Sequence, residues 1–325
     1  MKPLSILACS VCAVLATSAP LPAASQPYPA KPVRMIIPFP PGGATDILGR
    51  VLAQKLSEQL GQSVVIDNRP GAGGGIGTEL TAKAPPDGYT IQMATVSTHS
   101  IGPALNPKTP YDVKRDFVPI AHVADATNIL ITSPTLPVST LKELIAHARA
   151  NPGRLNFSSS GNGTIVHMTG EMFKMATGTF IVHIPYRGTA LAIPDLIAGQ
   201  VAFMFENIAS GLPHIKSGKV RALGISQLKR SPLVPDIPTM DEAGLKGFES
   251  NTYFGVFAPA GTPPAVAQRL NAEINKAVES TDVRGRFAAL GAEPVGGTSE
   301  QFARVIERET VKYAAVIKRA GIKPE

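Results

Sequence analysis

Apolar residues recur along this chain at two periods, one typical of strands and one typical of helices. The β-branched apolar run that begins at Val33 predicts a strand. The apolar residues that follow it, such as Leu48, Leu52 and Leu56, recur at helical spacing. This alternation continues nearly to the end of the chain and predicts an α/β fold with parallel strands. Further strands are predicted at Ser63–Asp67, Tyr89–Thr95, Ile120–Val123, Asn128–Thr132, Leu155–Ser158, Phe180–Ile184, Val201–Phe205, Val220–Ile225 and Tyr253–Ala258, and further helices at Leu141–Ala148, Ile165–Met175, Leu191–Ile197, Ala265–Ser280 and Ser299–Arg319.

Residues 1–25 have the layout of a secretory signal peptide. Lys2 precedes an uncharged apolar run, Leu4–Leu15, and small residues lead to Ser25. The apolar run is too short to span a bilayer, so export to the periplasm is expected. Cys9 and Cys12 are the two cysteines of the chain and both fall in this segment. Disulfides, thiolate metal sites and cysteine nucleophiles are therefore excluded from the mature chain.

The mature chain is long enough for two domains, since about three hundred residues exceed what one hydrophobic core usually supports. The extended pieces Ile120–Val123, Asn128–Thr132 and Tyr253–Ala258 separate a middle block from the rest of the alternation. We expect two α/β lobes joined by crossing strands. Lobe 1 would comprise residues 26–125 and 252–325, and lobe 2 residues 126–251. A ligand is expected between them, beyond the carboxyl ends of the strands.

The charge of the chain fits a small anionic ligand. The full chain carries a formal charge of +7, and removal of Lys2 with the signal leaves +6. A moderately basic exported protein attracts small anions to its clefts. Nucleic acid is a poor alternative, because no basic run is dense, tryptophan is absent and aromatic residues make up only 6% of the chain.

The loop between the first strand and the first helix is the leading candidate for ligand binding. Its sequence Pro-Phe-Pro-Pro-Gly-Gly, residues 38–43, ends at a helix start, where free N–H groups and the helix dipole favour an anion. Asp46 would repel an anion, so a helix-start cap or a water-positioning role is assigned to it. An ordinary strand–helix turn is the alternative for this loop. The candidate residues are Phe39, Pro41, Gly42, Gly43, Ala44, Thr45 and Asp46.

A second glycine-rich loop, residues 68–77, follows the second strand. Gly71 and Gly73 begin a dinucleotide-like pattern, but Ile76 stands where the third glycine is needed. The next strand also ends without an acidic residue for a ribose, so no cofactor is expected. Two interpretations of the loop stay open: a further carboxylate-binding loop that includes Gly73, and a purely structural loop.

Residues 158–164, Ser-Ser-Ser-Gly-Asn-Gly-Thr, form a third loop between a strand and a helix. Hydroxyl, carboxamide and backbone N–H groups hydrogen-bond a carboxylate without a buried counter-charge. The loop is not a nucleophile elbow, because Ser158 stands where the first glycine is needed. Thr164 is also a candidate helix N-cap. The candidate binding residues are Ser159, Ser160, Gly161, Gly163 and Thr164.

Three side chains at other strand ends complete the candidate set. Tyr186 offers an aromatic wall, Arg187 a guanidinium for a carboxylate, and Asn207 a hydrogen-bonding amide. A solvated surface position is the alternative for Arg187. His167 and Glu171 are one helical turn apart, but two ligands without a third do not make a metal site. No nucleophile–base pair, carboxylate pair or metal set emerges, which indicates binding without chemistry.

Together these motifs resemble the Bug family, the extracytoplasmic solute receptors of tripartite tricarboxylate transporters, over residues 28–323. The similar segments are residues 38–46, 67–77, 85–90, 159–164 with His167, 185–188, 236–244 and 259–263. The resemblance implies a type-II periplasmic-binding-protein fold whose lobes close on an organic carboxylate. It also implies that the loop Pro40–Asp46 holds one carboxylate through main-chain amides and ordered water, and that the loop Ser159–Thr164 contributes to the other end of the ligand.

Some positions depart from the family pattern. Tyr253 and Phe254 stand where an aromatic residue, often tryptophan, is common; Arg187 stands where lysine is frequent, and Glu206 where aspartate is frequent. The resemblance therefore indicates the class of ligand and leaves its identity open.

The sequence thus predicts a monomeric periplasmic receptor, not an enzyme, that binds a small mono- or dicarboxylate and delivers it to membrane permease subunits. No cofactor, metal or nucleic acid is expected. Two alternatives stay open: an exported α/β hydrolase or lyase acting on a carboxylate ester, with His167 or His183 as the base for Ser159 or Ser160, and a carboxylate sensor of a two-component system.

Overall fold

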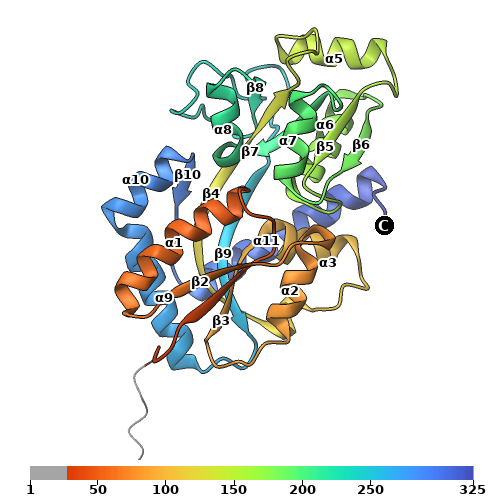
Figure 1. Ribbon diagram of the computed structural model, residues 1–325. Coiled ribbons are helices and arrows are strands. Elements are labelled where there is room, and N and C mark those ends of the chain that lie inside the picture. The colour runs from red at the N-terminus through yellow and green to blue at the C-terminus, as the bar shows by residue number, and fades with distance from the viewer. Residues whose placement is uncertain (1–27, 325) are drawn as a thin grey trace, which may run out of the picture.

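The computed structural model describes residues 28–324, so the predicted signal peptide lies outside the described residues. One sheet runs through the molecule in the strand order β2-β1-β3-β9-β4-β7-β5-β6, and β8 and β10 each pair with β4 (Figure 1). The strands are β1 Val33–Ile37, β2 Val64–Asn68, β3 Thr90–Thr95, β4 Phe117–Thr132, β5 Asn156–Ser159, β6 Val182–Pro185, β7 Phe203–Asn207, β8 Arg221–Ile225, β9 Asn251–Pro259 and β10 Ala292–Pro294.

Helices cover both halves of this sheet (Figure 1). They are α1 Ala44–Leu60, α2 Gly75–Ala82, α3 Gly102–Leu105, α4 Val113–Asp116, α5 Leu141–Ala150, α6 Ile165–Thr177, α7 Thr189–Ile197, α8 Ile208–Lys216, α9 Pro264–Glu279, α10 Thr281–Ala289 and α11 Ser299–Ala320. A 3-10 turn, Ala72–Gly74, precedes α2, and a π-helical turn, Ser97–Ile101, precedes α3. Within residues 28–324, no helix combines the length and apolarity needed to cross a bilayer.

Two antiparallel strands, β4 and β9, pass through the middle of the sheet and join its halves. They pair from Phe117 opposite Pro259 to Thr127 opposite Asn251. We call the half built on β1, β2, β3 and β10 lobe 1, and the half built on β5, β6, β7 and β8 lobe 2. The predicted lobe boundaries, 125/126 and 251/252, fall within these two strands and stay a prediction.

Strand β4 differs from the expectation of two separate extended pieces at Ile120–Val123 and Asn128–Thr132. It is a single strand of 16 residues. The intervening backbone stays extended because it pairs with β9 on one side and with β10 on the other, where Asp125 lies opposite Glu293. Strands that are distant in sequence thus provide the hydrogen-bonding partners that keep this segment extended, and the local sequence does not indicate them.

Helix α1 shows why the first predicted strand–helix unit forms as expected. Leu48, Leu52 and Leu56 lie on one face at helical spacing and are fully buried in the core of lobe 1. The helix ends at Gly61, whose φ of 66° is a left-handed conformation that glycine adopts without strain. The helix begins at Ala44, and its N-cap Gly43 is the last residue of the proline-rich loop.

Helix α8 was not predicted, although it directly follows Asn207. Gly211 and Pro213 both lie inside it and both are poor helix formers. The helix forms because Ile208 and Leu212 are buried against lobe 2, so tertiary packing outweighs intrinsic propensity. As a consequence, Asn207 occupies the start of a helix as well as the end of a strand.

Candidate functional site

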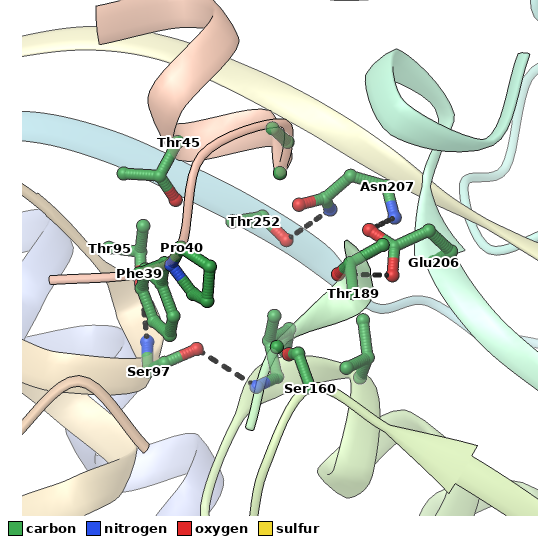
Figure 2. Close-up of a pocket in the computed structure, with 15 residues that line it drawn as sticks. Phe39, Pro40, Thr45, Thr95, Ser97, Ser160, Thr189, Glu206, Asn207 and Thr252 are labelled. Atoms are coloured by element: carbon green, nitrogen blue, oxygen red, sulfur yellow. Dashed lines mark hydrogen bonds between the residues drawn. The ribbon is translucent and has the colours of Figure 1, made fainter. Parts of the chain in front are cut away.

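A narrow cavity lies between the lobes, beyond the carboxyl ends of β1, β3, β5 and β7 (Figure 2). Its volume is about 40 Å³, which is room for about three water molecules. Both lobes contribute to its walls, so a ligand inside it contacts both. The lining residues are Phe39, Pro40, Gly43, Ala44, Thr45, Thr95, Ser97, Ser160, Ile165, Val166, Gly188, Thr189, Glu206, Asn207 and Thr252.

Four helices begin at this cavity. Ala44, Ile165 and Thr189 are the first residues of α1, α6 and α7, and Asn207 is the N-cap of α8. The first N–H groups of a helix have no intrahelical partner, and the helix dipole adds partial positive charge there. Among the described residues that line the cavity there is no lysine, arginine or histidine. The helix starts are therefore its source of positive potential, and the arrangement suits a small anion.

Asp46 orders the proline-rich loop from outside the cavity. Its Oδ2 accepts hydrogen bonds from the N–H of Gly42 and from Nε of Arg50, each at 3.0 Å. Its Oδ1 accepts a hydrogen bond from Nδ2 of Asn68 at 2.9 Å. Burial alone would raise the pKa of Asp46, but the bonds from Arg50, Gly42 and Asn68 hold it below its usual value. Its carboxylate thus fixes the loop at the helix start.

Ser160 and Ser159 play different parts in the third loop. Ser160 lines the cavity, whereas Ser159 is fully buried and does not. Ser159 Oγ donates to the carbonyl of Gly161 at 3.0 Å and lies 2.7 Å from Nε2 of His183. Thr164 donates to the same carbonyl at 2.7 Å. Ser159 and Thr164 therefore hold the loop in shape.

His183 and His167 stack behind this loop, with ring centroids 3.8 Å apart and planes inclined by 11°. Burial lowers the pKa of His167 to about 2, aided by the nearby charges of His183 and Lys174. Burial and the charge of Lys174 lower the pKa of His183 to about 4. Both rings are thus neutral at physiological pH and serve as packed aromatic surfaces.

Two glycines, Gly73 in the second loop and Gly188 just after β6, let the lobes approach each other closely. A Cβ on Gly73 would lie 2.6 Å from the carbonyl oxygen of Asn162 in the opposite lobe. A Cβ on Gly188 would lie 2.5 Å from Cγ of Pro40. In addition, the N–H of Ile165 in lobe 2 donates to Oγ of Ser97 in lobe 1 at 2.9 Å. These lobes are in direct contact around the cavity.

The structure distributes the predicted site residues over three places. Phe39, Gly43, Ala44, Thr45, Ser160 and Asn207 line the cavity. Gly73, Gly161, Gly163, Tyr186 and Arg187 line a neighbouring outer groove of about 510 Å³, which shares Phe39, Pro40, Ser97 and Ser160 with the cavity. Pro41, Gly42, Asp46, Ser159 and Thr164 line neither of these spaces. Asp46, Ser159 and Thr164 instead hold the loops in place through hydrogen bonds to neighbouring residues.

Several lining residues were not predicted. Glu206 and Thr189 had a signal in the sequence, because Glu206 precedes Asn207 at the end of β7 and Thr189 lies shortly after Arg187, beyond the end of β6. Thr95 is the last residue of β3, and Ser97 lies just beyond that strand. Thr252 had none, because it reaches the cavity only through the pairing of β9 with β4.

Glu206 is the one ionisable side chain among the described residues that line the cavity. Its Oε1 accepts the N–H of Asn207 at 3.0 Å and the hydroxyl of Ser210 at 2.6 Å. Its Oε2 accepts the hydroxyl of Thr189 at 2.8 Å. Burial raises the pKa of Glu206, and these three donors partly offset that effect.

Two α/β lobes that meet over a small anion-favouring cavity define a solute-binding receptor. Residues 48–322 match the tripartite tricarboxylate transporter family receptor, and the chain belongs to this family of periplasmic receptors. The resemblance to the Bug family and the predicted two-lobed periplasmic-binding-protein fold are thereby confirmed.

The chain is similar to relatives along nearly its whole length. It is 43% identical over 303 residues to the protein BugT of Bordetella pertussis, covering 93% of each chain. The structure titled R. palustris Rpa4515 with adipate is 36% identical, with a TM-score of 0.90 over 92% of this chain and 100% of that one. MatC from Rhodopseudomonas palustris with bound malate is 32% identical, with a TM-score of 0.85 over 89% of this chain and 100% of that one.

Proposed function

We propose that this protein captures a small organic mono- or dicarboxylate in the cavity between its lobes and presents it to the permease subunits of a tripartite tricarboxylate transporter. The observation that carries the proposal is the convergence of four helix starts on a cavity whose described lining has no cationic side chain. Export through the N-terminal signal would place the receptor in the periplasm, where it acts as a monomer.

Helix starts provide enough attraction for a useful receptor. Each contributes about 0.3–2 kcal/mol toward an anion. Several of them, acting in a cavity that excludes water, support micromolar affinity, which corresponds to about −8 kcal/mol. Because the ligand touches residues of both lobes, it stabilises the closed arrangement over an open one, as ligand-driven closure requires.

The similar solved structures support the same ligand class. Their titles name adipate in one case and malate in the other, both dicarboxylates. The cavity alone has room for about three water molecules, so a dicarboxylate of four or more carbons would also occupy the adjoining outer groove, with which the cavity shares Phe39, Pro40, Ser97 and Ser160.

An esterase activity has little support in the geometry. Ser159 is hydrogen-bonded to His183, yet it is buried and does not line the cavity. Ser160 does line it, but neither His167 nor His183 does. The serine that reaches the ligand space and the histidines that would serve as base are therefore separated.

The proposal is tested by a thermal-shift screen of the mature protein from Gln26 onward, after removal of any co-purified ligand. The panel comprises citrate, dicarboxylates of four to six carbons, aspartate, glutamate, nicotinate, benzoate and the phthalates. A ligand at about a hundred times its Kd stabilises the folded state by about 2.7 kcal/mol, which shifts the unfolding temperature by some degrees. A shift with one subset of carboxylates is expected; no shift with any of them would contradict the proposal.

A further inference from the structure

A relay of buried amides determines which end of the Asn207 side chain faces the cavity. Nδ2 of Asn128 donates to the backbone carbonyl of Ser250 at 2.9 Å, and a carbonyl oxygen only accepts hydrogen bonds. Oδ1 of Asn128 therefore points the other way, toward Asn207, whose Nδ2 lies 2.5 Å from it. The same Nδ2 donates to Oγ1 of Thr252 at 2.8 Å. Both N–H groups of Asn207 are thus used inside the protein.

Oδ1 of Asn207 is the end of the amide that remains for a ligand. Figure 2 shows this oxygen turned away from Glu206, toward the space between Thr45 and Thr252. Within residues 28–324, no donor lies at hydrogen-bond distance from it. Since Asn207 is only 7% exposed and lines the cavity, this acceptor faces the ligand space and not bulk water.

Glu206 adds a second acceptor beside it. Its carboxylate receives three hydrogen bonds, from the hydroxyls of Ser210 and Thr189 and from the N–H of Asn207. A carboxylate offers about four acceptor positions, and Oε2 has used one of its two. This end of the cavity therefore presents acceptors, whereas the start of α1 presents backbone N–H donors on the side of Thr45.

We propose, building on the carboxylate-binding function above, that the natural ligand carries its own hydrogen-bond donor, a hydroxyl or an ammonium group, which binds Oδ1 of Asn207 beside Glu206. The ligand class is then the hydroxy- or amino-substituted carboxylates. An unsubstituted carboxylate offers no donor to Oδ1 of Asn207, and a site built around a ligand donor discriminates strongly against an analogue that lacks it.

The test uses calorimetric titration of the mature, ligand-free receptor with three matched series. They are propionate, lactate and alanine; succinate, malate and aspartate; and glutarate, 2-hydroxyglutarate and glutamate. Within a series the chain length and the number of carboxylates are constant; the hydroxy acid adds a donor alone, and the amino acid adds a donor together with a positive charge. In the series that binds, the hydroxy or amino acid is expected to bind at least about tenfold more tightly than the unsubstituted acid.

Each outcome has a distinct meaning. Equal or tighter binding of the unsubstituted acid overturns the inference and leaves the carboxylate-receptor function intact. Binding that is confined to carboxylates without a donor does the same. Failure of every carboxylate to bind overturns both proposals. Preference for the hydroxy or the amino acid identifies the source of the donor, and either result supports the inference.

A variant separates this specificity role from a structural one. In Glu206→Gln the side-chain oxygen still accepts from Ser210 and from the N–H of Asn207, while the new NH₂ group replaces the acceptor Oε2 with a donor. The affinity ratio of donor-bearing to unsubstituted acid is expected to fall about tenfold or more. Glu279→Gln makes the same change on the exposed surface of α9 and is the matched control. An unchanged ratio in Glu206→Gln would overturn the inference.

Discussion

Gly73 of lobe 1 and the carbonyl oxygen of Asn162 in lobe 2 face each other so closely that a Cβ on residue 73 would lie 2.6 Å from that oxygen. The closed arrangement therefore requires that residue 73 has no side chain. Gly188 stands in the same relation to Pro40 on another side of the cavity. Two glycine-rich loops that suggest ligand binding in the sequence thus also have a role in bringing the lobes together.

Gly73→Ala should weaken ligand binding by about tenfold or more, because its Cβ holds the lobes apart and closure is coupled to binding. The matched control is Gly61→Ala. Gly61 has nearly the same left-handed backbone, φ 66° against φ 60° for Gly73, but nothing within 4 Å of its Cβ. Both variants lose about 1–2 kcal/mol of stability to backbone strain. Calorimetric titration should show a loss of affinity in Gly73→Ala alone; equal affinity in the two variants would contradict this prediction.

Gly43→Val should weaken binding by about tenfold or more without unfolding the protein. Gly43 lines the cavity with a φ of −80°, which any residue adopts, and a Cβ there would meet only the carbonyl of Pro40 at 3.8 Å. The valine side chain would therefore project where the ligand approaches the backbone. Unchanged affinity, with unfolding identical to that of the natural chain, would remove this loop from the binding site.

Stability should fall as the pH drops from about 6.5 toward 4. Burial lowers the pKa of His99 to about 3 and of His183 to about 4, and that of His167 to about 2, all below the usual 6.5. As the pH falls, these histidines are therefore protonated in the unfolded chain before they are protonated in the folded one. Their contribution to the free energy of unfolding is fully present above pH 6.5 and is lost progressively below it. Each histidine contributes up to about 1.4 kcal/mol per pH unit. Urea unfolding between pH 7.5 and 4.5 measures this slope, and a flat profile would show that the rings are not neutral when folded.

The two adjacent serines should respond in opposite ways to truncation. Ser159→Ala removes the hydroxyl that bonds Gly161 and His183, and should lower the free energy of unfolding by about 1–3 kcal/mol. Ser160→Ala removes a hydroxyl that lines the cavity and should lower ligand affinity while stability changes by less than about 0.5 kcal/mol. Chemical unfolding and titration of both variants check this pair. A stability loss confined to Ser160→Ala would reverse the assignment.

The sequence predicts those parts of the site that arise from local patterns. The proline-glycine loop after β1 and the Ser160 loop after β5 each follow an apolar strand and precede an amphipathic helix, so their place at the cleft follows from strand and helix periodicity alone. Helix α5, Leu141–Ala150, also corresponds to the helix predicted at Leu141–Ala148, and in the structure Thr140 is its N-cap.

The remaining features depend on contacts between distant segments. Thr252 reaches the cavity because β9 pairs with β4, and the orientation of Asn207 depends on Asn128 and Ser250. Helix α10, Thr281–Ala289, was not predicted: the helix predicted at Ala265–Ser280 stops where α9 ends, and the next predicted helix begins only at Ser299. None of these relationships has a period or a motif that a single sequence displays.

The most direct test of carboxylate binding at the helix starts compares each candidate acid with its uncharged primary amide. Calorimetric titration of the ligand-free mature receptor should give a Kd in the micromolar range or below for at least one small carboxylate. Its amide should bind at least about a hundredfold more weakly, because the helix starts favour a negative charge. Equal affinity for acid and amide, or no binding of any carboxylate, would contradict the proposed function.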